Sequence, residues 1–512
     1  MIPTRNRVLL LPAILLVLAF AQSDASPWVD WEAVAKIREE GFQRSQLPDT
    51  LSYMTDVLGA RLTVSPGMRR AQEWAVGEME RIGLENIEIE PFMDYGISWS
   101  NDYVSLHLLE PDYQPMVGYP LSHTPGTQGR QELEVVIADM RTAAGLDTLR
   151  GTLAGRAVLW TPPAEIDLAR LNAGTARWTE EQLDELSRPR PAAPRRPRAS
   201  ADGLLSDEER MRFLRDEGVA VILESRSGWP GAVRGFGRPG TKVDRWARKE
   251  SLESLPIVAV TPEHYNRMYR ILQREIAVRI EIEVRNSIGD DGQQAANVLG
   301  EIRGTDLADE IVMLGAHFDT WHASPNASDN TSGVAVMLEA MRILRAVGVE
   351  PRRTIRVALW SGEEQGLFGS RAYVNRHFGN PNDPEVGLKP GYERFSVYFN
   401  QDYGPGKYRG IYLQGNEHVR RLFTAWMEPF HDLGMTAVSP RGVGSTDHVP
   451  FDDAGLPGFQ FLQDRAGSTG GHTNMDFYDT LPIEDLKHNA VVMAAYVYHA
   501  AMLDQRIPRK GR

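Results

Sequence analysis

Apolar and polar positions follow different periods in different parts of this 512-residue chain. Near the N-terminus, residues 30–51 and 67–82 place charged side chains between apolar ones at the spacing of amphipathic helices. From about residue 122 the pattern changes to short buried-strand runs, followed by the alternating segment Ile276–Val284. Residues 120–285 are therefore predicted to form a smaller β-rich domain inserted into a larger one.

After Ala296 the chain alternates apolar strands with amphipathic helices. One helix is predicted by an apolar stripe at Val334, Leu338, Met341 and Leu344. This alternation predicts an α/β fold, a mostly parallel sheet sandwiched by helices. The strands that predict its sheet are 311–314, 354–360, 395–399 and 459–462. Because the smaller domain interrupts it, the larger domain is expected in two parts, residues 27–119 and 286–505.

The composition narrows the classes of partner and of chemistry. A formal charge of −13 argues against a nucleic-acid partner. The chain has no cysteine, which excludes disulfides, thiolate metal ligands and a cysteine nucleophile. Stability must therefore come from the apolar core, and metal binding can add to it.

The first 21 residues read as a secretory signal peptide. Arg5 and Arg7 precede the apolar run Val8–Phe20, and Ala19 and Ala21 fit a cleavage site with small residues. An uncleaved N-terminal anchor is the alternative, although the run is short for a membrane span. We expect a secreted or periplasmic protein without stable membrane association after removal of the signal. Farther along, the arginine- and proline-rich stretch Ser187–Ser200 is typical of a disordered surface loop.

Histidine and acidic residues follow the predicted strands of the larger domain. Open α/β sheets place their sites beyond the carboxyl ends of strands. Imidazole and carboxylate groups together suit zinc, and a carboxylate beside a ligand can accept a proton from water. Each short motif taken alone is more often structural, so their shared position along one sheet edge carries the prediction. The residues are His317, Asp319, Asp329, Glu363, Glu364, Asp402 and His472.

The motifs that contain or accompany these residues are His317-x-Asp319, Ser328-Asp-Asn-x-x-Gly333, Trp360-Ser-Gly-Glu-Glu-Gln-Gly366, Asn400-Gln-Asp402, Ser445-Thr-Asp-His448 with Ala454-Gly-Leu-Pro457, and His472-Thr-Asn-Met-Asp476. In this order they resemble the co-catalytic di-zinc exopeptidases, a family that includes secreted leucyl aminopeptidases and plasma glutamate carboxypeptidase (carboxypeptidase Q). The resemblance covers about Ala296 to the C-terminus, and the family often carries a protease-associated insert, which residues 120–285 resemble.

The resemblance implies two zinc ions per chain, a peptide substrate and a role for each site residue. His317 and Asp402 would hold one zinc, and Glu364 and His472 the other. Asp329 would bridge the two ions, and Glu363 would be the general base. Asp319 is expected to accept a hydrogen bond from His317 and so fix its tautomer.

One position departs from the family pattern. Secreted aminopeptidases of this type often have tyrosine before the last histidine, whereas this chain has Gly471. The oxyanion donor is thus left open, and the chain moves towards the carboxypeptidase Q-like branch. Two other readings stay open, a metal-free binding relative and a single-zinc glutaminyl cyclase. We further expect His322 and His448 to line the substrate pocket, and Trp321 to be either a pocket wall or ordinary packing.

Overall fold

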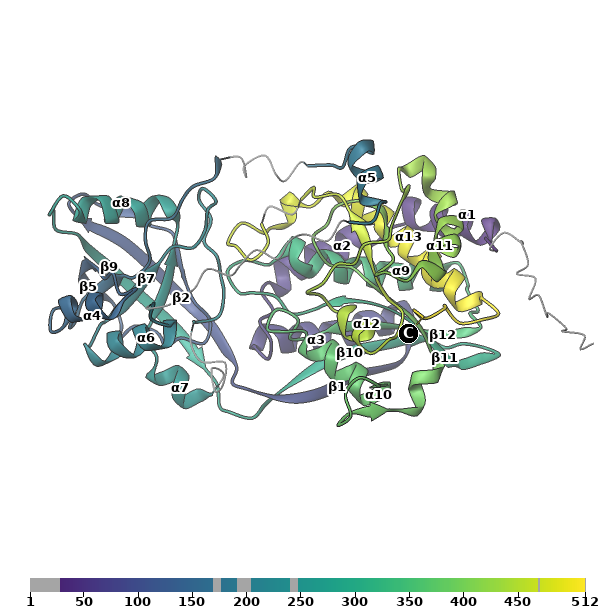
Figure 1. Cartoon of the computed structure of the whole chain (residues 1–512), viewed down its shortest axis with the longest axis horizontal. Helices are drawn as coiled ribbons and strands as arrows, with labels where there is room; N and C mark the ends of the chain where they lie inside the picture. Colours follow the sequence, from purple (N-terminus) through teal and green to yellow (C-terminus); the bar gives the residue numbers. More distant parts are fainter. Residues whose placement is uncertain (1–27, 169–175, 191–203, 240–246, 468–469, 512) are drawn as a thin grey trace, which may run out of the picture.

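The computed structural model describes residues 28–168, 176–190, 204–239, 247–467 and 470–511. The predicted signal peptide and most of the arginine-rich stretch lie outside these residues. Within them, no helix is both long and apolar enough to cross a bilayer. The fold is mixed α/β, with two eight-stranded sheets side by side along the long axis of the molecule (Figure 1).

The first sheet has a parallel centre and largely antiparallel flanks. Its central strands β12, β11, β15 and β18 run parallel, whereas β10 and β16 pair antiparallel to them on either side. The prediction of a mostly parallel sheet therefore describes the centre, which carries the site. In sheet order the strands are β1 (Glu85–Gly96), β10 (Gln293–Ile302), β12 (Arg353–Trp360), β11 (Leu307–His317), β15 (Phe395–Asn400), β18 (Gly458–Gln463), β16 (Tyr408–Tyr412) and β17 (Ala437–Ser439).

Helices cover both faces of this sheet because successive side chains of each strand point to opposite faces. In β11, Val312, Leu314 and Ala316 belong to one apolar cluster with the helices of the first face, and Met313 belongs to the cluster of the second face. The first face holds α1 (Trp31–Gln43), α2 (Leu47–Ser52), α3 (Pro66–Ile82), α9 (Ser332–Ala346), α11 (Arg420–Met427) and α13 (Ile483–Met502), and the second holds α10 (Phe368–His377) and α12 (Val449–Asp453).

Local sequence sets the ends of these helices. Ser65 caps α3 by accepting a hydrogen bond from the backbone N–H of Met68, and Gly83 ends the helix in the left-handed conformation. The segment predicted as one helix over 30–51 forms two, because α1 ends at Gln43 and Pro48 lies in the first turn of α2. The predicted helix 67–82 agrees with α3.

The second sheet starts earlier than the boundary at residue 120. Strand β2 begins at Trp99 and pairs antiparallel with β9, from Trp99 opposite Ile288 to Glu110 opposite Arg279. The chain thus enters and leaves this unit at adjacent strands. In sheet order the strands are β3 (Gln114–Pro115), β2 (Trp99–Glu110), β9 (Arg279–Ile288), β5 (Gln131–Ile137), β6 (Ala157–Leu159), β7 (Val221–Glu224), β8 (Ile257–Val260) and β4 (Gly118–Pro120).

Helices also accompany the second sheet, which has two apolar clusters of its own. The helices beside its strands are α4 (Ala143–Leu149), α6 (Asp207–Asp216), α7 (Arg248–Glu253) and α8 (Pro262–Leu272) (Figure 1). Helix α5 (Glu180–Leu186) lies over the first sheet instead (Figure 1). There, Leu183 packs against Ala437 and Leu462, and the indole N–H of Trp178 donates to the carbonyl of Gln463 over 2.7 Å. The second unit thereby reaches the edge of the sheet where the site lies.

Candidate metal centre

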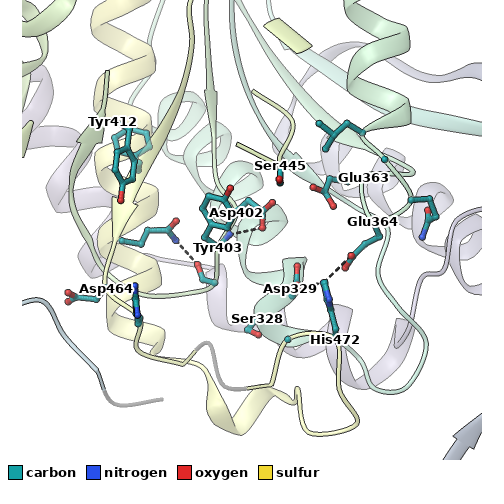
Figure 2. Close-up of a pocket in the computed structure, with 18 of the residues that line it drawn as sticks. Ser328, Asp329, Glu363, Glu364, Asp402, Tyr403, Tyr412, Ser445, Asp464 and His472 are labelled. Atoms are coloured by element: carbon teal, nitrogen blue, oxygen red, sulfur yellow. Dashed lines mark hydrogen bonds and ion pairs between the residues drawn. The ribbon is translucent and has the colours of Figure 1, made fainter. Parts of the chain in front are cut away.

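The predicted site residues meet because the central strands end level with one another. His317 pairs with Trp360 across β11 and β12, and Gly315 pairs with Asn400 across β11 and β15. The loops that follow these strands therefore start side by side. Five of the predicted residues line one cavity of about 940 Å³, and Figure 2 shows them converging from separate segments: Asp329, Glu363, Glu364, Asp402 and His472.

Asp329 lies between two imidazoles. Its Oδ1 is 3.3 Å from Nε2 of His317, and its Oδ2 is 2.9 Å from Nε2 of His472. His317 is also 3.7 Å from Oδ1 of Asp402, and His472 is 3.0 Å from Oε2 of Glu364. One carboxylate thus connects two groups of side chains, each made of one histidine and one further acid.

The backbone of Asp319 orients His317, and this corrects the sequence-based expectation. Nδ1 of His317 is 2.9 Å from the backbone carbonyl oxygen of Asp319, whereas the nearer carboxylate oxygen is 3.9 Å away. The expectation that the carboxylate accepts this hydrogen bond was therefore wrong. With Nδ1–H donating to the carbonyl, Nε2 is the nitrogen that faces Asp329 and Asp402, and it can bind a metal ion once it has lost its proton.

The Asp319 carboxylate orients the two glutamates instead. It is fully buried and accepts hydrogen bonds from the backbone N–H groups of Glu363 and Glu364, over 3.1 and 3.3 Å. The hydroxyl of Thr63 is 3.3 Å from the same carboxylate. Because these donors belong to the loop after β12, Asp319 fixes the path of the backbone that presents both glutamate side chains.

Trp321 holds the second glutamate, a role that the sequence did not reveal. Its indole N–H donates to Oε2 of Glu364 over 2.8 Å, and the side chain is 6% exposed. Trp321 does not border the cavity, so it is not a pocket wall. It is buried like a core residue, but its hydrogen bond to Glu364 gives it a role beyond ordinary packing. Nothing in the local pattern distinguishes such a tryptophan from an ordinary core residue.

The buried acids strongly perturb one another and the two histidines. Burial raises the pKa of Glu363 well above its usual value, and it raises the pKa of Glu364 to about 7, with Asp329 adding to that rise. Burial would also raise the pKa of Asp329, but His472 and His317 lower it overall. For His472 the burial penalty is outweighed by Asp329 and Glu364, and its pKa rises to about 10.

These features fit a metal ion better than a purely protein network. The ligand atoms of His317, Glu363 and Asp402 all lie within 4.8 Å of one another. The same holds for those of His317, Asp329 and Glu364. Oε1 of Glu364 is buried without a hydrogen-bond partner. A buried carboxylate oxygen left in this way is costly unless a cation binds it. Nitrogen and carboxylate donors without thiolate are a zinc set.

Neither of the two histidines expected in the substrate pocket lines the cavity. Nε2 of His322 lies 2.7 Å from the carbonyl of Pro120, and the ring packs edge-on against Trp99. His448 is buried and lies 3.1 Å from the carbonyl of Val443. Both rings are therefore packed between segments, and burial lowers the pKa of each to about 4.

The fold and the acid–histidine cluster define a metal-dependent hydrolase with its site at the carboxyl edge of an α/β sheet. Residues 297–497, which carry every predicted site residue, match the family model described as Peptidase family M28. This match and the relatives below identify the chain as a zinc metallopeptidase of the co-catalytic exopeptidase group.

Known proteins resemble the chain to different extents. It is 23% identical to carboxypeptidase Q from Bos taurus over 484 residues, which covers 93% of this chain and 90% of that protein. It is 30% identical to aminopeptidase YwaD from Bacillus subtilis over 223 residues, 42% of this chain and 46% of that protein.

Solved structures share the fold across nearly the whole chain. The structure of a Peptidase M28 precursor from Shewanella amazonensis covers 94% of this chain and 99% of its own, with a TM-score of 0.67 and 21% identity. The zinc aminopeptidase BSAP from Bacillus subtilis covers 90% and 95%, with a TM-score of 0.57 and 18% identity. At these identities the structural likeness concerns the fold alone.

Proposed function

We propose that this protein is a secreted exopeptidase with two zinc ions that hydrolyses short peptides with a free terminus. The observation that carries the proposal is the position of Asp329, whose two carboxylate oxygens face His317 and His472. A carboxylate placed between two nitrogen donors suits two ions that share a ligand.

The remaining ligands divide on the two sides of Asp329. His317 and Asp402 would hold one zinc, and His472 and Glu364 the other, in line with their pairing distances of 3.7 and 3.0 Å. When bound, zinc supplies Lewis acidity, which makes water more acidic and polarises a carbonyl oxygen. His317 ends β11 and Asp402 lies two residues beyond β15, so this pair needs little reorganisation on binding, whereas His472 lies in a loop after β18.

Glu363 would act as the general base. Burial raises the pKa of its side chain, which makes the carboxylate a stronger proton acceptor than an exposed glutamate. Its backbone is fixed by Asp319, and its side chain borders the same cavity as Asp329. It would accept a proton from the attacking water and return it to the leaving amine.

The position of the second unit beside the cavity favours a short peptide as the substrate. We propose that it is a protease-associated insert, and Trp178, which the insert places against the first sheet, borders the cavity. Figure 2 shows the acid–histidine group at one side of the cavity and Tyr412 with Asp464 at the other. A pocket walled in this way restricts entry, and a free terminus then fixes the register of the peptide.

The extent of similarity favours a carboxypeptidase Q-like enzyme over the aminopeptidase prototype. Carboxypeptidase Q aligns with almost the entire chain, whereas YwaD aligns with less than half of it. Gly471 also favours the carboxypeptidase Q-like branch, because secreted aminopeptidases of this type often have tyrosine at this position. A side chain there would approach Oδ2 of Asp329, because an added Cβ would lie 3.3 Å from it.

A panel of dipeptides tests the proposal directly. Purified, zinc-loaded protein is given the same dipeptide in four forms, unblocked, N-acetylated, C-amidated and blocked at both ends, with casein as a control. We expect hydrolysis of the unblocked dipeptide, loss of activity when the doubly blocked form replaces it, and no internal cleavage of casein. Equal turnover of all four forms, together with casein cleavage, would refute an exopeptidase.

Export is tested separately on the mature protein. The basic N-region and the apolar run before Ala21 motivate the proposal. N-terminal sequencing is expected to place the mature start near residue 22, in protein recovered from the medium or periplasm. Protein that keeps Met1 and occurs only in the cytosol would contradict export without affecting the proposed chemistry.

A further inference from the structure

A segment of the second unit is paired with the loop that carries His472. Residues 233–236, the clamp segment, run beside residues 472–474 of the first unit. The N–H of Gly235 donates to the carbonyl of His472 over 3.0 Å. The N–H of Val233 donates to Oδ1 of Asn474 over 2.7 Å, and the N–H of Asn474 donates back to the carbonyl of Val233 over 3.1 Å. An antiparallel bridge joins Arg234 and Thr473 between them.

The aromatic ring of the clamp segment, Phe236, supports both residues of one proposed zinc half-site, His472 and Glu364. Phe236 packs edge-on against the imidazole of His472, with ring centres 5.2 Å apart. It also packs edge-on against Trp321, with centres 5.4 Å apart, and Trp321 donates to Glu364. Phe236 therefore supports His472 directly and Glu364 through Trp321.

The loop needs such support because its backbone is not in a preferred conformation. His472 has a φ of 57°, in the left-handed region that residues with a side chain rarely adopt. Gly235 allows the clamp segment to pass close to Ala323 while its N–H reaches the carbonyl of His472, since a Cβ there would lie 2.7 Å from the Cβ of Ala323. Two backbone segments in close contact thus hold the imidazole in place.

We infer that the clamp segment, with Phe236 at its centre, positions His472 and Glu364 as a pair, so that the inserted unit completes one of the two zinc half-sites. This inference rests on the proposed di-zinc function. His317 and Asp402 are held by strand ends of the first sheet and have no corresponding contact with the clamp segment among the described residues. The coupling is reciprocal, so that zinc bound at His472 also tightens the clamp segment.

Site-selective zinc affinity in the full-length protein tests the inference. Phe236→Leu keeps an apolar side chain and removes the flat ring, and Phe236→Tyr keeps the ring. Phe213→Leu, in the apolar core of the second unit, is the matched control for loss of a ring elsewhere. Zinc is titrated into each chelated protein against a fluorescent competitor, and the melting temperature of each metal-free protein is recorded.

We expect Phe236→Leu to weaken one of the two zinc equivalents by about 10–100-fold, the range known for residues that orient a ligand, and to leave the other unchanged. Phe236→Tyr should restore the affinity, and Phe213→Leu should lower only the melting temperature. Two zinc equivalents of wild-type affinity in Phe236→Leu would overturn the inference and leave the proposed function intact. Absence of zinc binding in the wild-type protein would overturn both.

Hydrogen exchange supplies a readout independent of affinity. Zinc added to the chelated wild-type protein should slow exchange of the Gly235 and Asn474 amides by several-fold, because both donate across the clamp. His472→Ala should abolish that response while leaving exchange in the core of β7 unchanged. Equal exchange at Gly235 with and without zinc would show that metal and clamp are not coupled.

Discussion

Oδ2 of Asp329 lies 2.9 Å from Nε2 of His472, while the other oxygen of the same carboxylate faces His317. The contact joins a loop after β18 to the turn before α9, and Asp476 of the same loop also links the two segments by accepting hydrogen bonds from the N–H groups of Ser328 and Asp329. In the metal-free protein the pair is held by charge, since Asp329 and Glu364 outweigh the burial penalty and raise the pKa of His472 to about 10.

Replacement of Asp329 by alanine should release both zinc ions. The two ions would otherwise face each other without the shared negative charge, and zinc binding adds stability to the native state by linkage. We expect less than one zinc per chain and a lower melting temperature than the zinc-loaded wild type. Asp479→Ala, at an exposed position, is the control. The difference in melting temperature between the variant and the wild type should shrink when both are chelated, because only the ion pairs of Asp329 with the two histidines then distinguish them. A variant with two zinc ions would show that Asp329 is not the bridge.

Glu363→Gln should keep both zinc ions and lose turnover by about 10²–10⁴-fold, because an amide has the shape of the acid and cannot accept the proton. Metal content and kcat are measured on the same sample. The outcome also decides between two roles, since Glu363 lies within ligand distance of His317 and Asp402. Loss of one zinc in the variant would identify Glu363 as a ligand.

Asp319→Asn should lower kcat by about 10–100-fold with little effect on zinc affinity. The carboxylate accepts the N–H groups of Glu363 and Glu364, and the amide offers only one acceptor oxygen to them. His317 keeps its partner, because that partner is the backbone carbonyl of residue 319. A large drop in zinc affinity with kcat preserved in the zinc-saturated variant would instead favour the role expected from the sequence.

The parallel centre of the first sheet could be predicted from the sequence. Runs such as Thr354–Trp360 are mostly apolar, of strand length and followed by turn residues, and β12 covers Arg353–Trp360. Because parallel strands share their carboxyl edge, the same pattern predicted where the loops with His317 and Glu364 would meet. The structure brings these residues together, and zinc binding by them stays a prediction.

Long-range partners could not be predicted in the same way. Strand β2 joins the second sheet through β9, which is far away in the sequence, so no local signal marked Trp99 as the start of that unit. Trp321 and Phe236 have the same appearance in the sequence as core aromatics, and only their contacts with Glu364 and His472 reveal another role. The hydrogen-bond acceptor of His317 is a backbone carbonyl oxygen. Every residue has one, so the residue types in the sequence do not identify it.

Zinc binding should release protons near neutral pH. In the metal-free protein, burial raises the pKa of Glu364 to about 7, and the neighbouring acids hold His472 protonated, with a pKa of about 10. Both must lose their proton to bind a metal ion. Protons therefore compete with zinc as pH falls, and apparent affinity should rise with pH from 6 to 8. Calorimetry in two buffers of different ionisation enthalpy measures the release, and equal heats in both would contradict it.

We propose that two zinc ions together make this site an exopeptidase. Chelated protein is titrated with zinc while hydrolysis of an unblocked dipeptide is followed, and the bound metal is measured at each point. We expect activity to reach its plateau at two zinc ions per chain and Asp329→Ala to stay inactive throughout. Full activity at one zinc per chain, or no hydrolysis at any zinc content, would contradict it.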